Sequence, residues 1–365
     1  MSIQPDNDGL FARLRRGFAV LGFLYLGAVI LLAVPWFQSH ILYMNALKLP
    51  WNAHFDAPER HGLAPGKTAN IKIQTADNHT LGAWFILSDT IYHNLSFPPP
   101  PYAAELHISE AVAQRPTVLF FHGNAATRAL SMRVRLYSGF TSRLNANVLA
   151  IDYRGFGDSP GTPTEDGLSL DARAAWDWLI AQGASPQDIL IVGHSLGTAV
   201  ASRLSVDLSE DGVKFKGTVL MSPFSSLYTL IDTYNIFGVF PVMLPINMIP
   251  RAAGNTSPIC VQKLKVPILL LHAEDDWDIS HTHSDALFDA LLESYLPPVY
   301  SPPASQESWS TQQWNEYHAQ LVTRRETRES LVTRTVIPDF GLMDQVGTLE
   351  GVQEVIRVTF FTPEA

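Results

Sequence analysis

The run from Ile189 to Leu204 constrains the fold of this chain more than any other segment. Residues 189–192 are continuously apolar, which is typical of a buried strand, and residues 198–204 are typical of a helix. The pattern G-x-S-x-G lies between them at residues 193–197. A strand, a tight turn and a helix in this order place the hydroxyl of Ser195 at the carboxyl edge of a sheet, because the two glycines let the strand and helix approach closely. The alternative is a Gly-Ser turn in an ordinary βα unit.

Further apolar runs of similar length alternate with helical patterns such as residues 171–180. Short continuous apolar runs are typical of parallel strands buried on both faces. Before them, residues 71–75 and 81–87 indicate two strands of a hairpin. We therefore predict a doubly wound α/β fold with a mostly parallel sheet. The predicted parallel strands are residues 117–121, 147–151, 189–192, 218–221 and 266–271.

Composition excludes two classes of protein. The chain has 365 residues, of which 46% are hydrophobic and 16% charged, and this balance excludes a disordered chain. The 25 basic and 35 acidic residues give a net charge of −10, so nucleic acid is not expected as a partner. No histidine, cysteine or carboxylate cluster has metal-ligand spacing, and we predict no metal and no cofactor.

The N-terminus carries an uncharged run from Phe18 to Phe37, preceded by Arg13, Arg15 and Arg16. About 20 residues suffice to cross a bilayer core. The positive-inside rule places residues 1–16 in the cytoplasm, residues 17–38 in the membrane and the rest of the chain on the other side. A cleavable signal peptide is the alternative, but the run exceeds the usual length of its apolar core and lacks a good cleavage site.

Three glycosylation sequons, at Asn78, Asn94 and Asn255, fit a lumenal domain. The single cysteine, Cys260, allows no internal disulfide, which argues against a disulfide-stapled secreted enzyme. We predict a single-pass glycoprotein of the endoplasmic reticulum membrane.

The pattern divides the chain into residues 39–110, a connector with N-terminal strands, and residues 111–365, the main domain. Residues 229–250 are almost uncharged and apolar, which indicates either a cap for acyl chains or a pair of core helices. Residues 297–330 contain two Pro-Pro pairs and a Ser/Gln-rich stretch, and are predicted to be an exposed insertion.

Acyl transfer by a serine needs a base, an acid that orients the base, and donors for the developing oxyanion. Ser195 is the predicted nucleophile. The backbone N–H groups of Asn124, after the first parallel strand, and of Leu196 are the predicted oxyanion donors. Asp276 follows a later strand and is the predicted acid, with Asp275 as the neighbour that could replace it.

Five segments carry a resemblance to a family. They are His122-Gly123-Asn124-Ala125, residues 152–159, the serine turn, Ser222-Pro223-Phe224, and His272-Ala273-Glu274-Asp275-Asp276. In this order, and after a single N-terminal anchor, they resemble the membrane-anchored α/β-hydrolase-domain lipases that cleave monoacylglycerols and lysophosphatidylserine, the fungal branch in particular. The resemblance implies an α/β-hydrolase fold, Ser195 as nucleophile and Asp276 as acid. It implies a structural role for residues 152–159.

The catalytic histidine departs from the family pattern. The family places it after the last strand and before the last helix, for which residues 331–337 and 351–356 are the candidates, and Met343 stands in its place. A thioether cannot take the serine proton. The remaining histidines after the acid, His281, His283 and His318, are expected at the surface. A missing piece of sequence is a second explanation.

Three functional hypotheses remain. The first is a membrane-anchored serine hydrolase that cleaves carboxylic esters of single-chain lipids, monoacylglycerol or lysophospholipid, through an acyl-enzyme. The second is an impaired or inactive relative that binds lipid or a partner through the same pocket, which Met343 favours. The third is an esterase that acts on a non-lipid ester.

Overall fold

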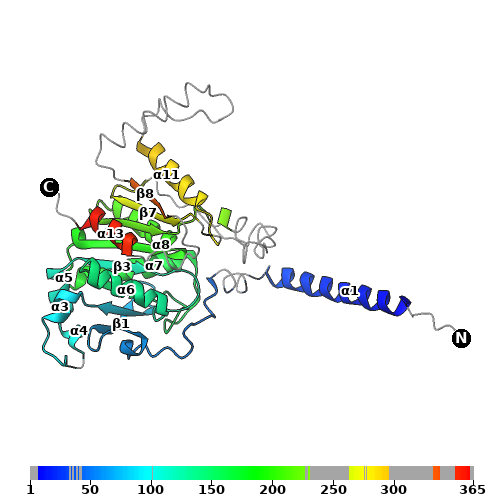
Figure 1. Ribbon diagram of the computed structural model, residues 1–365, viewed down its shortest axis with the longest axis horizontal. Coiled ribbons are helices and arrows are strands. Elements are labelled where there is room, and N and C mark those ends of the chain that lie inside the picture. The colour runs from blue at the N-terminus through cyan, green and yellow to red at the C-terminus, as the bar shows by residue number, and fades with distance from the viewer. Residues whose placement is uncertain are drawn as a thin grey trace, which may run out of the picture.

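Strands from distant parts of the sequence join one sheet. The computed structural model describes residues 7–32, 34, 37, 40, 43–100, 102–226, 229–230, 263–274, 276, 278–295, 332–337 and 350–361. Within these residues the sheet has eight strands in the order β1-β2-β4-β3-β5-β6-β7-β8 (Figure 1). The strands are β1 (Thr68–Gln74), β2 (Thr80–Ile86), β3 (Thr117–Phe121), β4 (Asn147–Ile151), β5 (Ile189–His194), β6 (Gly217–Met221), β7 (Ile268–Ala273) and β8 (Val332–Ile337).

The predicted hairpin and parallel sheet are confirmed. β1 and β2 pair antiparallel, and β2 pairs antiparallel with β4. All later neighbours, from β4–β3 to β7–β8, pair parallel. Because parallel neighbours point their carboxyl ends to one edge, the loops after β3, β5, β6, β7 and β8 all leave the sheet at that edge.

Successive residues of a strand point to opposite faces of the sheet, so the strands contribute side chains to two hydrophobic cores, one on each face. In β3, Leu119 and Phe121 pack on one face, whereas Val118 and Phe120 pack on the other. The first face is covered by α7 (Glu165–Ala181), α8 (Leu196–Glu210) and α11 (Thr282–Tyr295). The second is covered by α6 (Ser131–Arg143) and α13 (Glu350–Phe360). Helices on both faces make the fold doubly wound, as predicted.

Shorter helical segments lie near the chain's start and before β5. They are η1 (Pro58–His61), α3 (Asp89–His93), α4 (Ala103–Leu106), α5 (Ile108–Gln114) and η2 (Pro186–Asp188). The first four lie in the same part of the chain as β1 and β2, whereas η2 leads directly into the central strand β5. The segment assigned to residues 39–110 from sequence therefore contributes two strands to the same sheet as the later residues.

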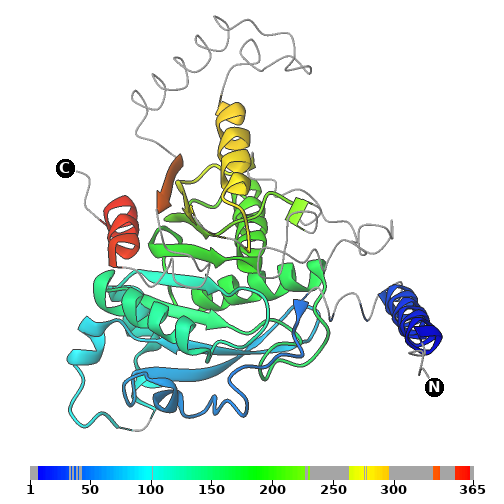
Figure 2. The same cartoon turned by 45° about the vertical axis from the view of Figure 1, so that its right-hand side comes forward.

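Helix α1 (Asn7–Leu32) extends away from the sheet in both views (Figures 1 and 2). Its large apolar side chains Phe11, Phe18, Phe23 and Leu24 are exposed. Among the described helices, none has both the length and the apolar character of a membrane span. The anchor predicted at residues 17–38 is therefore not confirmed.

Several sequence predictions fall outside the described residues. Apart from Thr229 and Leu230, these include the apolar segment 229–250 and the insertion 297–330. Asn255, Cys260, Asp275, His318 and Met343 lie outside them as well.

Candidate active site

Ser195 occupies the sharp turn between β5 and α8. Its backbone has φ 50° and ψ −117°, a combination that residues other than glycine rarely adopt. The turn is fixed on the neighbouring strand, because the N–H of Ser195 donates to the carbonyl of Met221 at 3.0 Å. The Ser195 residue is 6% exposed. A serine held in this way cannot relax into an ordinary turn without breaking the β5–β6 register.

The two glycines of the turn are required by close approach of backbone to backbone. A Cβ at Gly193 would lie 2.3 Å from the carbonyl oxygen of Gly197. A Cβ at Gly197 would lie 2.0 Å from the carbonyl oxygen of Phe121. Any larger residue therefore separates α8 from the ends of β5 and β3. This is the physical reason for the G-x-S-x-G spacing in this chain.

The loop after β3, residues 122–127, lies directly against the serine; we call it the oxyanion loop. A Cβ at Gly123 would lie 3.3 Å from the Cβ of Ser195. The structure thus brings together the segment of Asn124 and that of Leu196, the two predicted oxyanion donors. Leu196 is the first residue of α8, so its N–H has no partner within the helix and belongs to the positive end of the helix dipole.

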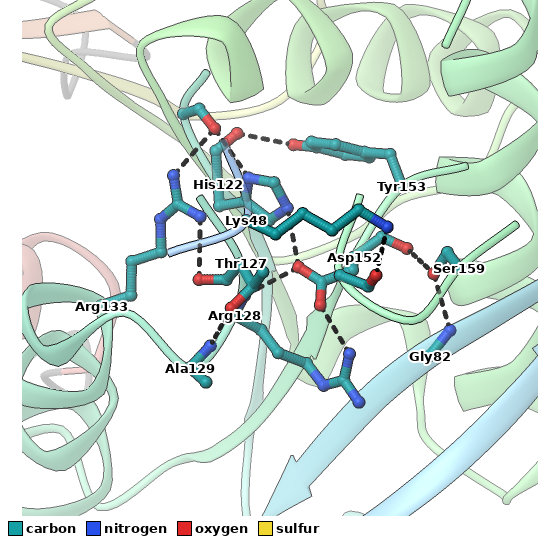
Figure 3. A network of polar contacts seen from close by, with 12 residues as sticks. Lys48, Gly82, His122, Thr127, Arg128, Ala129, Arg133, Asp152, Tyr153 and Ser159 are labelled. Carbon is teal, nitrogen blue, oxygen red and sulfur yellow. Dashed lines mark hydrogen bonds and ion pairs between the residues drawn. The ribbon is translucent and has the colours of Figure 1, made fainter. Parts of the chain in front are cut away.

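Two elements hold the oxyanion loop from behind, and neither was predicted from sequence. The guanidinium of Arg133 on α6 faces the loop's carbonyl groups (Figure 3). On another side, residues 43–49, the N-terminal strap, supply three carbonyl acceptors. The N–H groups of Ala125, Ala126 and Thr127 donate to the strap carbonyls of residues 43, 47 and 49 at 3.2, 2.7 and 3.0 Å.

A buried charge network lies beneath the loop (Figure 3). Arg128 donates from Nη1 to Oδ2 of Asp152 at 2.6 Å, and its backbone N–H donates to Oδ1 at 2.7 Å. Burial alone raises the pKa of the Asp152 carboxyl, but the charge of Arg128 and the contact with His122 outweigh it, so the pKa lies below its usual value. Ser159 donates to the carbonyl of Asp152 at 2.7 Å. These contacts agree with the structural role expected of residues 152–159.

His122 does not serve Ser195 as a base in this arrangement. Its Nδ1 is 2.7 Å from the carbonyl oxygen of Gly123, and its Nε2 is 3.2 Å from Oδ1 of Asp152. Burial and the charge of Arg133 lower the pKa of its imidazole. Both ring nitrogens therefore lie beside groups other than the serine hydroxyl.

Asp276 follows β7 at the same edge of the sheet and is buried. Its Oδ1 accepts from the backbone N–H groups of Asp278 and Ile279 at 3.1 and 2.9 Å. Its Oδ2 is also buried, and it has no hydrogen-bond partner among the described residues. Two backbone donors orient the carboxylate and leave one oxygen for a further donor, as the acid of a serine triad requires.

The last strand passes beside this carboxylate. In β8, Val336 and Ile337 are in register with His272 and Ala273 of β7. The chain therefore leaves β8 at the edge where Asp276 lies, and α13 begins at Glu350. Residues 338–349 connect the two, contain no histidine and include Met343. The predicted final strand and final helix are confirmed.

The expectation that the other late histidines lie at the surface is wrong for His283. This residue is 3% exposed, and its Nδ1 lies 3.0 Å from the hydroxyl of Ser225, which follows β6. Burial, together with the nearby His272, lowers the pKa of its imidazole. His283 shares a helix face with Leu287 and Leu291, both buried, and this i, i+4, i+8 spacing explains its burial. His281 is partly exposed, beside Asp285.

Among the residues that the structure describes, no group of three histidine, cysteine or carboxylate side chains could hold a metal ion. The groups that the structure places at this sheet edge are a serine on a strained turn, backbone donors and a buried carboxylate. This combination defines a hydrolase of the α/β class.

Comparison with known proteins supports the assignment to the α/β-hydrolase class and identifies a smaller group of relatives within it. Residues 118–346 match the alpha/beta hydrolase family. The lysophosphatidylserine lipase ABHD12 of Macaca fascicularis is 34% identical over 282 residues, which cover 74% of this chain and 68% of the relative. The same lipase from Danio rerio is 29% identical over 295 residues, or 79% of this chain and 75% of the relative.

Solved structures support the fold alone. An α/β-hydrolase from Vibrio vulnificus has a TM-score of 0.57 at 17% identity, covering 89% of this chain and 93% of that one. An esterase from Pyrococcus furiosus has a TM-score of 0.56 at 17% identity, covering 86% and 95%. The chain belongs to the α/β-hydrolase family and, within it, to the group of ABHD12-like lipases.

Proposed function

We propose that the chain is a serine hydrolase that cleaves carboxylic esters of single-chain lipids, either monoacylglycerols or lysophospholipids. One observation carries the proposal: the oxyanion loop lies against Ser195, with Gly123 so close that an added Cβ would approach that of the serine to 3.3 Å. An ester carbonyl seated between the two segments has a nucleophile on one side and backbone donors on the other. The lysophosphatidylserine lipases among the relatives support the choice of a single-chain lipid.

The reaction proceeds in two acyl transfers. The Ser195 O–H bond breaks, its proton passes to a base or to water, and the oxygen forms a bond to the ester carbonyl carbon, while the N–H groups of Asn124 and Leu196 stabilise the resulting oxyanion. The C–O bond to the glycerol oxygen then breaks, the leaving alcohol takes a proton, and the fatty acyl group remains on the serine. Water attacks the acyl-enzyme and releases the fatty acid, which restores the serine hydroxyl.

The second candidate is an impaired relative that binds lipid without efficient turnover. Residues 338–349 contain no histidine, and Met343 cannot accept the serine proton. The proton of Ser195 then passes to solvent, which slows the first transfer. The buried carboxylate of Asp276 and the strained serine turn favour the enzyme, whereas Met343 favours the impaired relative.

A fluorophosphonate probe distinguishes the two candidates. We expect the full chain to be labelled at a measurable rate and Ser195→Ala not to be labelled. Ser222→Ala is a suitable control, since this residue also lies in a turn with positive φ at the same sheet edge. Absence of labelling at any pH between 6 and 9 would rule out the hydrolase, and equal labelling of Ser195→Ala would place the nucleophile elsewhere.

We also propose that the N-terminal segment attaches the chain to the endoplasmic reticulum membrane, with the hydrolase domain in the lumen. The exposed apolar side chains of α1 and the basic residues Arg13, Arg15 and Arg16 support this orientation. Asn78 and Asn94 of two sequons are exposed. Endoglycosidase treatment of the expressed protein is expected to shift its mobility, and Asn78→Gln with Asn94→Gln is expected to reduce that shift. No shift in the intact chain would oppose lumenal placement.

A further inference from the structure

Arg133 is the only charged side chain seen among the described residues that reaches several carbonyl groups of the oxyanion loop. Its Nη2 lies 3.0, 3.1 and 2.9 Å from the carbonyl oxygens of Gly123, Asn124 and Ala125. Its Nη1 donates to the carbonyl of Thr127 at 3.0 Å. The residue is 7% exposed, and its contacts with Gly123 and Thr127 are buried, where a charge-assisted hydrogen bond is strong, while those with Asn124 and Ala125 are partly buried.

The position of the Gly123 carbonyl determines the direction of the Asn124 N–H. In a trans peptide the C=O of one residue and the N–H of the next point in opposite directions. Since the Gly123 oxygen faces Arg133, the N–H of Asn124 faces away from it. Gly123 also lies against the Ser195 segment, where an added Cβ would come within 3.3 Å of the Cβ of Ser195, so this part of the loop lies between the guanidinium and the nucleophile.

The rest of the loop is strained and needs external support. Ala125 and Ala126 have φ values of 54° and 53°, which alanine adopts only where its surroundings impose them. Their N–H groups are bound by the N-terminal strap, and the carbonyl of Ala125 by Arg133. Without the guanidinium, four carbonyl groups of the loop lose a donor, which favours a change in the direction of its peptide units.

We infer that Arg133 is a positioning residue of the oxyanion hole: its guanidinium fixes the Gly123–Asn124 peptide so that the Asn124 N–H faces the reacting carbonyl. The inference rests on the proposed function. The positive charge also polarises this peptide, which makes the N–H a better donor to an oxyanion. A lysine carries the same charge but lacks the planar guanidinium with its several N–H donors. It can therefore bind only some of the four carbonyl groups.

Binding of an alkylboronic acid tests the role of Arg133 in the oxyanion hole without catalytic turnover. The serine oxygen donates a lone pair to boron and loses its proton to solvent, which gives a tetrahedral, anionic adduct that needs the oxyanion donors. In the full chain, Arg133→Met is expected to weaken octylboronic acid binding about 10- to 100-fold, and Arg133→Lys less. Arg135→Met, an exposed arginine of the same helix, is the matched control and should bind like the unaltered chain.

1-Octanol binds without forming an adduct with the serine. Its affinity therefore distinguishes a loss of oxyanion-hole geometry from a general distortion of the binding site. We expect Arg133→Met to bind 1-octanol as the unaltered chain does. A parallel loss of both ligands, or boronate affinity equal to that of Arg135→Met, would overturn the inference. If Ser195→Ala binds boronate as tightly as the unaltered chain, the proposed function itself fails, and the inference fails with it. If Arg133→Met does not fold, the same comparison is made with Arg133→Lys.

Discussion

Oδ2 of Asp276 lies 3.5 Å from Nε2 of His272, and the two are not hydrogen-bonded. Both ring nitrogens of His272 bind other groups. Its Nε2 donates to the carbonyl of Ile279 at 2.8 Å, and its Nδ1 lies 2.6 Å from the hydroxyl of Ser284. A buried carboxylate oxygen therefore stays available for a donor from another segment. β8 ends at this same edge of the sheet.

Introducing a histidine at position 343 is expected to supply the missing base. Met343→His should raise kcat/KM for a short-chain ester by about 100- to 10,000-fold, because general-base catalysis contributes effects of this size. Hydrolysis of p-nitrophenyl octanoate measures it. Met343→Leu is the control, and Met343→His with Ser195→Ala should be inactive. A Met343→His variant no faster than Met343→Leu would show that the base does not belong at this position.

Gly197→Ala is expected to disrupt the serine turn. Its Cβ would lie 2.0 Å from the carbonyl oxygen of Phe121, so α8 has to move away from β3. We expect a loss of about 2–4 kcal/mol in the free energy of unfolding, measured by urea titration, and a large loss of fluorophosphonate labelling. Gly351→Ala, in helix α13 with open space around it, is the control; it should leave labelling unchanged and should not lower the free energy of unfolding. Equal effects of the two substitutions would contradict the steric argument.

Asp152→Asn is expected to destabilise the fold strongly. The substitution keeps the shape of the side chain but leaves Arg128 buried with one of its two carboxylate partners lost. Removing one member of a buried pair costs about 3–5 kcal/mol in the free energy of unfolding. Arg173→Met removes two ion pairs at the surface, with Asp177 and Asp211, and should cost less than about 1 kcal/mol in the same urea titration. A loss in Asp152→Asn no larger than in Arg173→Met would mean that the buried pair contributes no more than a surface one.

Stability is expected to fall on acidification from neutral pH because of His122 and His283. Burial holds the pKa of each imidazole below the ordinary 6.5 in the folded chain. Below that pH the unfolded chain binds protons that the folded chain does not, so the free energy of unfolding decreases as the pH falls. His283→Gln should reduce this dependence between pH 7.5 and 5.5, measured as the shift in urea midpoint. An unchanged slope would show that His283 is not held neutral.

The parts of the site that the sequence predicts are those encoded by local patterns. The turn at Ser195 is visible because strand, glycines and helix adjoin, and the final strand and helix follow from their apolar spacing. The burial of His283 could have been predicted as well, since it continues the apolar face of Leu287 and Leu291.

The supports of the oxyanion loop could not be predicted in this way. Arg133 is one of many arginines in helical segments, and nothing in its neighbours identifies the carbonyl groups that it binds. The N-terminal strap meets its partner loop about 80 residues further along the chain mainly through backbone groups, with the Thr127 hydroxyl as a side-chain donor to the carbonyl of Leu49. Hydrogen bonds between main-chain groups depend on the path of the chain. They place little constraint on which residue types occur, so the sequence does not reveal them.

The strap also decides where the chain tolerates cleavage. A protease that cuts before Tyr43 separates α1 from the sheet and leaves all three strap acceptors in place. A cut after Leu49 removes those acceptors together with the helix, and the strained alanines of the loop lose their partners. Cleavage between the end of α1 and Tyr43 is thus expected to release a fragment whose oxyanion loop keeps its supports, whereas cleavage after Leu49 is expected to release one whose loop has lost them.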